Sequence, residues 1–171
     1  AICNARLIDR AIRPRFPQYL SREVQVINTV LSWDAENDPD IPGIVATSLS
    51  LSISDIPWSG PLAAIRIGRK DGQFILNPSY ADREKSDMDL FLSAGLDPSE
   101  ELLVNMIEGN FEEAEENLIS EALEFSREAL KQICDFQKQI QKQAGNDKIP
   151  IEEPLKDSLL EQEFKTFLGK R

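Results

Sequence analysis

The sequence contains no histidine and only two cysteines, and each of these shortages removes a class of chemistry. Without histidine, a Ser-His-Asp triad, a Cys-His nucleophile pair and a His-ligated zinc site are excluded. Cys3 and Cys134 lie far apart and form no CxxC motif. Any catalysis must therefore rest on carboxylates, lysines, arginines or a group supplied by another chain.

Long apolar segments are also missing. No run reaches the roughly 18 apolar residues that a membrane-spanning helix needs, and the first residues lack the layout of a signal peptide. We therefore expect a soluble protein with no membrane partner. A chain of 171 residues, 41% of them hydrophobic, is long enough for one globular domain and an appendage.

Charge is distributed unevenly along the chain. The formal net charge is -11, and residues 71–171 hold 23 of the 30 acidic residues. The first 22 residues hold five arginines and a single acid, Asp9. A basic N-terminal segment of this kind could hold phosphate groups in spite of the acidic total.

The first half of the chain alternates between helical and strand patterns. Residues 1–12 have apolar side chains at helical spacing, and Pro14 ends this pattern. Because this helix begins without a cap or a preceding strand, we expect a piece of a larger domain, truncated at its N-terminus. Residues 23–31 predict a half-buried strand. Residues 40–53 favour a helix packed closely on a sheet, although their many small residues are also compatible with a strand.

Two hairpins and a long helix follow. Residues 62–68 and 73–76 flank an Asp-Gly turn, and residues 89–94 and 102–107 flank a second turn, so we expect a sheet of at least five strands. Residues 112–143 form one long amphipathic pattern. We place a domain boundary after it, with residues 1–145 as the core domain and 146–171 as a linker followed by a short helix.

Several segments, in one order, resemble the first core domain of polynucleotide phosphorylase. The usual sequence in this family is ARLIDRPIRPLFP followed by EVQV, and this chain has ARLIDRAIRPRFP at residues 5–17 and EVQV at residues 23–26. Further matching segments are Asn37 to Ile41, Leu49 to Ser52, Ile56-Pro57, Gly60-Pro61, Arg66 to Gly68 and Asn77-Pro78. The resemblance covers roughly residues 1–143, and residues 148–171 would begin the all-helical linker domain of that family.

The resemblance implies an α+β fold, a ribonuclease-PH-like βαβα core present twice in a longer polypeptide, with three polypeptides forming a ring. It also implies a phosphorolytic 3′-to-5′ exoribonuclease, or polyribonucleotide nucleotidyltransferase, which degrades mRNA with inorganic phosphate as co-substrate and releases nucleoside diphosphates. Mg²⁺ would serve the second core, which is absent here. The expected partners are RNA, a homotrimer and an RNA-degradation assembly, and the expected location is the cytoplasm, with an organellar source left open.

Three arginines are the candidate RNA and phosphate ligands. Arg6, Arg10 and Arg13 are spaced so that they share one face of the first helix, and guanidinium groups fit phosphate oxygens. The resemblance implies contacts with RNA for the corresponding arginines. The alternative is a solvated basic face with Asp9 or Glu23 as ion-pair partner. Arg15 replaces the family's usual leucine, and its role stays open.

Catalysis within this segment is not expected. In active cores a Gly/Ser- or Thr-rich turn holds the attacking phosphate, whereas residues 37–40 here read Asn-Asp-Pro-Asp, with two carboxylates and one residue that lacks an N–H. Asp87 and Asp89 resemble the metal-binding DMD segment of the active core, and aspartates two apart on a strand could share a cation. Phe91 stands where the active core has lysine, so a structural role for these aspartates is the alternative.

Two other functions remain open at this point. One is a stand-alone ribonuclease-PH-like phosphorolytic nuclease that uses Asp87 and Asp89 as metal ligands. The other is a protein-binding scaffold whose working surface is the acidic helix at residues 112–128.

Overall fold

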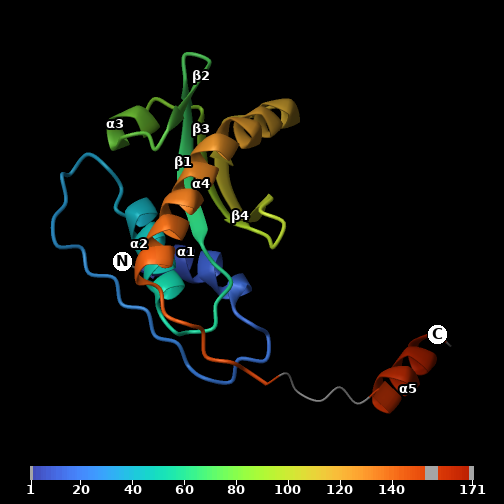
Figure 1. The fold of residues 1–171 in the computed structure, drawn as a ribbon. Coiled ribbons are helices and arrows are strands. Elements are labelled where there is room, and N and C mark those ends of the chain that lie inside the picture. The colour runs from blue at the N-terminus through green and yellow to red at the C-terminus, as the bar shows by residue number, and fades with distance from the viewer. Residues whose placement is uncertain (1, 153–157, 170–171) are drawn as a thin grey trace.

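The computed structural model describes residues 2–152 and 158–169, and its centre is an antiparallel sheet (Figure 1). The sheet has four strands in the order β2-β1-β3-β4. Their bounds are β1 Leu62–Lys70, β2 Gln73–Leu76, β3 Met88–Leu96 and β4 Leu102–Phe111. The structure is therefore α+β, as expected from the sequence.

Both hairpins predicted from the sequence are present. In the first, Asp71 and Gly72 have φ values of 52° and 77°, and this left-handed pair closes the turn between β1 and β2. In the second, β3 pairs with β4 along its full length, from Met88 opposite Phe111 to Leu96 opposite Leu102. The register shifts by one residue near Ser93, so β4 carries a bulge there.

Helices cover the two faces of the sheet. The helices are α1 Ile2–Ile12, the 3-10 helix Arg13–Arg15, α2 Asp40–Ile53, α3 Tyr80–Arg83, α4 Glu116–Ala144 and α5 Ser158–Leu168. Alternate residues of β1 contribute to two apolar clusters, because successive side chains of a strand point to opposite faces. Leu62 and Ala64 pack in a cluster with α1 and α2, and Ala63 and Ile65 pack in a cluster with α4.

Two expectations about the sheet are wrong. Residues 23–31 form no strand, and the sheet of the described residues has four strands rather than at least five. The segment runs as a wide loop between α1 and α2 (Figure 1). It has the composition of a strand, but no other strand lies beside it among the described residues, and a strand needs a neighbour for its backbone hydrogen bonds.

The chain beyond α4 returns to α2. The backbone N–H of Asn146 donates to the carbonyl of Ile53, and that of Ile149 donates to the carbonyl of Asp55. The predicted helix at residues 155–168 is present as α5 from Ser158, and residues 155–157 lie outside the described part. Among the described helices, none has the length and apolar character that crossing a membrane requires.

Candidate functional site

The candidate arginines lie on the solvent side of α1 and of the 3-10 helix that continues it, in which Arg13 is the first residue. Ile8, Ala11 and Ile12 fix the helix against the core, since all three are buried. Arg6, Arg10 and Arg13 are exposed, as the spacing predicts. The helix therefore presents a row of guanidinium groups on the face opposite its packed side.

Two of the three arginines already have acidic partners. An Nη1 of Arg10 lies 2.7 Å from a carboxylate oxygen of Glu108 on β4, and both side chains are 54% exposed. Arg13 pairs with Asp9, one turn earlier, at 2.7 Å, and this hydrogen bond raises the pKa of Arg13. The side chain of Arg6 has no hydrogen bond or ion pair with any described residue. The alternative of a paired, solvated face thus applies to Arg10 and Arg13, although Glu108 was not foreseen as a partner.

Arg15 points into the protein rather than toward solvent. Its guanidinium donates to the carbonyl oxygens of Ser59, at 2.5 Å, and Leu96, at 2.6 Å. Burial lowers the pKa of Arg15. Gly95 makes room for this side chain, because a Cβ at that position would lie 2.7 Å from Nη2 of Arg15. The role that the sequence left open is therefore structural: Arg15 ties the end of α1 to the rim of the sheet.

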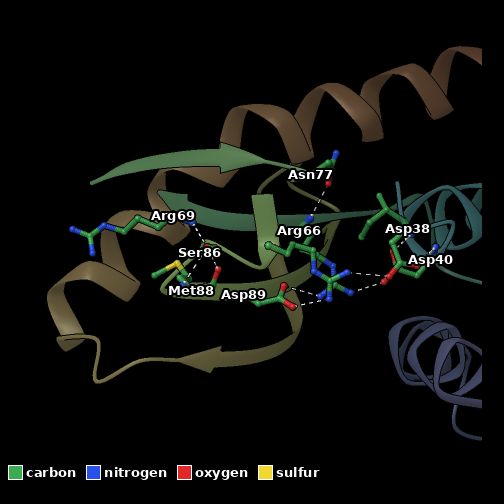
Figure 2. A network of polar contacts seen from close by, with 10 residues as sticks. Asp38, Asp40, Arg66, Arg69, Asn77, Ser86, Met88 and Asp89 are labelled. Carbon is green, nitrogen blue, oxygen red and sulfur yellow. Dashed lines mark hydrogen bonds and ion pairs between the residues drawn. The ribbon is translucent and has the colours of Figure 1, made fainter. Parts of the chain in front are cut away.

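A cluster of ion pairs lies at the start of α2 (Figure 2). Arg66 on β1 reaches Asp40 at 2.5 Å and Asp89 on β3 at 2.8 Å. Arg83 on α3 reaches Asp89 at 2.8 Å and Asp38 at 3.1 Å. Burial alone lowers the pKa of Arg66, but its hydrogen bonds to Asp89 and Asp40 outweigh burial, so the pKa lies above its usual value. We call these five residues the Arg66 cluster.

The ion pairs of the Arg66 cluster change the reason why residues 37–40 are unsuited to bind phosphate. Asp38 and Asp40 were expected to repel phosphate, yet each is paired with an arginine. The backbone donors nearby are also occupied: Asp38 accepts from the N–H of Asp40, and Asp40 accepts from the N–H of Ile41. This turn offers its own carboxylates to the amides that an anion would otherwise bind.

Asp34 satisfies the donors at the start of the same turn. Its carboxylate accepts from the N–H groups of Glu36 and Asn37, both at 2.9 Å, and from the side-chain amide of Asn37. These hydrogen bonds, led by the backbone of Asn37, lower the pKa of Asp34 to about 2. The turn before α2 is thus held by the chain's own acids from residue 34 to residue 41.

The two aspartates proposed as metal ligands have separate partners. Asp87 pairs with Arg69 at 2.8 Å, and Asp89 pairs with Arg66 and Arg83. Within residues 2–152 and 158–169, no group of three or more His, Cys, Asp or Glu side chains is arranged to hold a metal ion. Arginines occupy both oxygens of Asp89 and one oxygen of Asp87, whose Oδ1 is buried and has no hydrogen-bond partner among the described residues. These two carboxylates therefore do not by themselves offer the several oxygens that a divalent cation requires. Metal binding by Asp87 and Asp89 stays a prediction.

Sequence reasoning missed the residues that organise this region. Arg66 and Arg83 are far from Asp38 and Asp40 in the chain, and no local spacing connects them. The one available signal was a short strand with an arginine among apolar residues, Ile65-Arg66-Ile67, because a charge flanked by buried residues requires a partner. That signal predicts a partner without saying which carboxylate supplies it.

Comparison with known proteins gives a consistent result. Residues 60–129 match the model of the 3′ exoribonuclease family, domain 2. The chain is 45% identical over 170 residues to the polyribonucleotide nucleotidyltransferase of Thermotoga petrophila, a match that covers 99% of this chain and 23% of that protein. It is 41% identical over 165 residues to the enzyme of the same name from Halalkalibacterium halodurans, covering 96% of this chain and 23% of that one.

A third relative, from Finegoldia magna, is 40% identical over 167 residues and has the same name. The chain spans less than a quarter of the length of these curated relatives. The resemblance that the sequence motifs indicated is confirmed by these matches. The chain is therefore homologous to one part of polyribonucleotide nucleotidyltransferase, and its sheet and the first half of α4 fall in the region that matches domain 2 of the 3′ exoribonuclease family.

Proposed function

We propose that this chain is part of a phosphorolytic 3′-to-5′ exoribonuclease, in which it guides RNA and does not cleave it. The intact enzyme would attack the last phosphodiester bond of RNA with inorganic phosphate and release a nucleoside diphosphate. The name of the relatives supports the activity. The exposed arginine row of α1 is the observation that carries the guiding role.

The arginine row suits a sequence-independent hold on the RNA backbone. Phosphate contacts from arginine position a strand without reading its bases. The side chain of Arg6 has no acidic partner among the described residues and can contact a phosphate group directly. Arg10 and Arg13 are held by exposed ion pairs, and because exposed ion pairs are weak, a phosphate group can displace Glu108 or Asp9.

A guiding role also agrees with the turn before α2. Phosphate attack needs donors that hold the nucleophile, and the amides of Asp40 and Ile41 are already occupied by carboxylates of the chain. We therefore assign the binding of the attacking inorganic phosphate, and of Mg²⁺ where the enzyme uses it, to parts of the enzyme outside these 171 residues. We further propose that the intact protein is a cytoplasmic homotrimer that works with other RNA-degradation proteins.

The first prediction tests the arginine row directly. Binding of a labelled oligoadenylate to the chain is measured as a function of salt for the original sequence and for Arg6→Ala. Loss of one phosphate contact should weaken binding about threefold to tenfold at low salt and reduce the slope of log K against log salt by about 0.7.

Arg127→Ala is the matched control. Arg127 is an exposed arginine on α4 that pairs with Glu124, so its removal changes the net charge by the same amount as Arg6→Ala. We expect little change in oligoadenylate binding for this variant. Equal effects of the two substitutions, or no effect of either, would show that α1 does not hold RNA.

A further inference from the structure

A pocket of about 420 Å³ lies between the first turns of α4 and the neighbouring ends of the strands. Arg69 of β1 lines this pocket and pairs with Asp87 at 2.8 Å. The other charged residues of the lining are glutamates: Glu112, Glu113, Glu115 and Glu121. Within the described part of the chain, none of these glutamates has an ion pair or a side-chain hydrogen bond. A cleft lined by charges of one sign concentrates ligands of the opposite sign, so the pocket favours a positively charged ligand.

An exposed aromatic pair adjoins the pocket. The rings of Phe74 on β2 and Phe125 on α4 have centroids 5.3 Å apart, and Phe125 is 42% exposed. Phe74 lies directly opposite Arg69 in the β1–β2 ladder. Phe125 lies one helical turn after Glu121. Leu76, which is 38% exposed, extends the apolar surface on the same face of β2 as Phe74. We call the pocket, the aromatic pair and Leu76 the acidic–aromatic surface.

The arrangement of the carboxylates limits what this surface can bind. Across residues 2–152 and 158–169, no three His, Cys, Asp or Glu side chains are arranged to hold a metal ion. Nucleic acid is unsuited as well, because acidic side chains repel its phosphates. The carboxylates suit a ligand whose positive charges lie apart from one another, as the ammonium groups of lysines do along a polypeptide. The aromatic pair offers an adjacent site for an apolar side chain.

We infer that the acidic–aromatic surface docks a basic and partly apolar segment of another protein. A lysine of this segment enters the pocket, and an apolar neighbour packs on Phe74 and Phe125, whose rings also attract a nearby ammonium group. Complementarity selects this occupant, because the glutamates require positive charge and the exposed rings require apolar surface. A segment that carries both covers the whole surface, whereas a free polyamine satisfies only the pocket.

The acidic–aromatic surface is separate from the arginine row of α1. Figure 2 shows the side chain of Arg69 extending away from the Arg66 cluster, as expected for residues three apart on a strand. Phe74 packs against the apolar cluster of α4, whereas α1 packs in the cluster on the other face of the sheet. RNA on α1 and a partner on α4 would therefore occupy opposite faces, and the inference does not rest on the proposed function.

Fluorescence anisotropy with the full-length protein tests the inference. The probe is a short labelled peptide of alternating lysine and leucine. One reference peptide has serine in place of leucine, and the other has glutamate in place of lysine. The lysine–leucine peptide should bind about tenfold more tightly than either reference peptide. Equal binding of the lysine–serine peptide would overturn the inference, because charge alone would then account for the affinity, and so would equal binding of the glutamate–leucine peptide.

Two variants of the full-length protein locate the binding site. Glu121→Gln removes one charge of the pocket and should weaken binding of the lysine–leucine peptide about threefold at low salt and less at high salt. Phe125→Ala should weaken it about tenfold at both salt concentrations, because buried aromatic anchors dominate such contacts. Asp135→Asn and Phe136→Ala are the matched controls, since both side chains are exposed on α4 and lie outside the surface. The inference fails if a control weakens binding as much as its matched variant.

Two further outcomes would identify a different occupant and overturn the inference. If spermidine binds more tightly than the lysine–leucine peptide and Phe125→Ala leaves its affinity unchanged, the ligand is a free polyamine. If sedimentation shows self-association that Phe125→Ala abolishes, the occupant is a second copy of the chain. Arg6→Ala should leave peptide binding unchanged, so the docking surface and the proposed function can fail independently.

Discussion

Arg66 extends from β1 between two carboxylates, Asp40 of α2 and Asp89 of β3, and its side chain is only 13% exposed. The carboxylate of Asp40 is 2% exposed, so it depends on this arginine for compensation of its charge. Removal of one partner from a buried pair is more destabilising than removal of both, because it leaves an unpaired charge in the interior.

The second prediction follows from that asymmetry. Arg66→Met should lower the free energy of unfolding by about 3–5 kcal/mol, and adding Asp40→Asn in the same chain should restore part of the loss, since a neutral amide costs less to bury. Urea denaturation measures both. Arg13→Met, which breaks an exposed pair, is the control and should leave the free energy of unfolding nearly unchanged. A double variant less stable than Arg66→Met would contradict the argument.

At the scale of residues, the sequence predicts what local spacing determines and misses what the fold brings together. The common face of Arg6, Arg10 and Arg13 follows from helical geometry alone. The pairing of Arg10 with Glu108 does not, because the two residues are 98 positions apart. Arg15 turns inward because the 3-10 turn after α1 redirects it, and only the structure reveals the two carbonyl oxygens that it meets.

Elements with local signals were predicted well. The Asp-Gly pair predicts the β1–β2 turn because few other residue pairs adopt two positive φ angles. The helix of residues 40–53 is confirmed although its serines favour it weakly, since it is fixed by packing on β1 rather than by propensity. The prediction of a strand at residues 23–31 is wrong for the opposite reason. The composition of the segment suits a strand, but none of the four strands of the described residues lies beside it.

Lys148 connects two elements that the sequence could not relate. Its ammonium group donates to the carbonyl oxygens of Leu51, Ser52 and Ser54 at the C-terminal end of α2, at 2.6, 3.1 and 2.7 Å. Burial lowers the pKa of this amine. A lysine at this position donates hydrogen bonds to carbonyl oxygens that have no partner within the helix. Its positive charge also interacts favourably with the negative end of the helix dipole. The segment assigned to a linker is thus anchored to α2 at this point, and the predicted boundary after residue 145 stays a prediction.

The third prediction concerns this contact. Lys148→Met keeps most of the apolar stem but removes the charge and the donors, so the free energy of unfolding should fall by about 1–2 kcal/mol. Lys142→Met, in the exposed last turn of α4, serves as control and should have little effect. The free energy of unfolding of both variants is measured by denaturation in urea. If the two variants are equally stable, water replaces the ammonium group at the carbonyl oxygens of α2 without loss of stability.

On the scale of the whole molecule, the sheet separates the two charge regions seen in the sequence. The arginine row is on α1, which packs with α2 in one apolar cluster, whereas the acidic first half of α4 belongs to the helix that packs in the other. RNA approaching α1 would therefore meet little of the acid that dominates the net charge of -11. This arrangement would allow an acidic chain to carry the proposed phosphate-binding surface.

The last prediction concerns the stability of the whole molecule at acid pH. Hydrogen bonds lower the pKa of Asp34 to about 2, led by the backbone N–H of Asn37, and those from Ser79 and Ser99 lower the pKa values of Asp82 and Asp97. A carboxylate with a lowered pKa contributes stability above its unfolded value, and this contribution is lost as the pH falls through the folded value. The loss should therefore begin below about pH 4 and continue to about pH 2.

A second effect acts in the opposite direction above that range. Between neutral pH and the isoelectric point near 4.5, protonation of other carboxylates reduces the negative charge and so reduces self-repulsion. The melting temperature should thus rise slightly toward pH 5 and fall below pH 4. Added salt should flatten the rise but preserve the fall, because close hydrogen bonds are screened less than distant charges. Asp34→Asn should make the fall at low pH shallower, and a melting temperature that is constant down to pH 2 would show that these hydrogen bonds do not stabilise the fold.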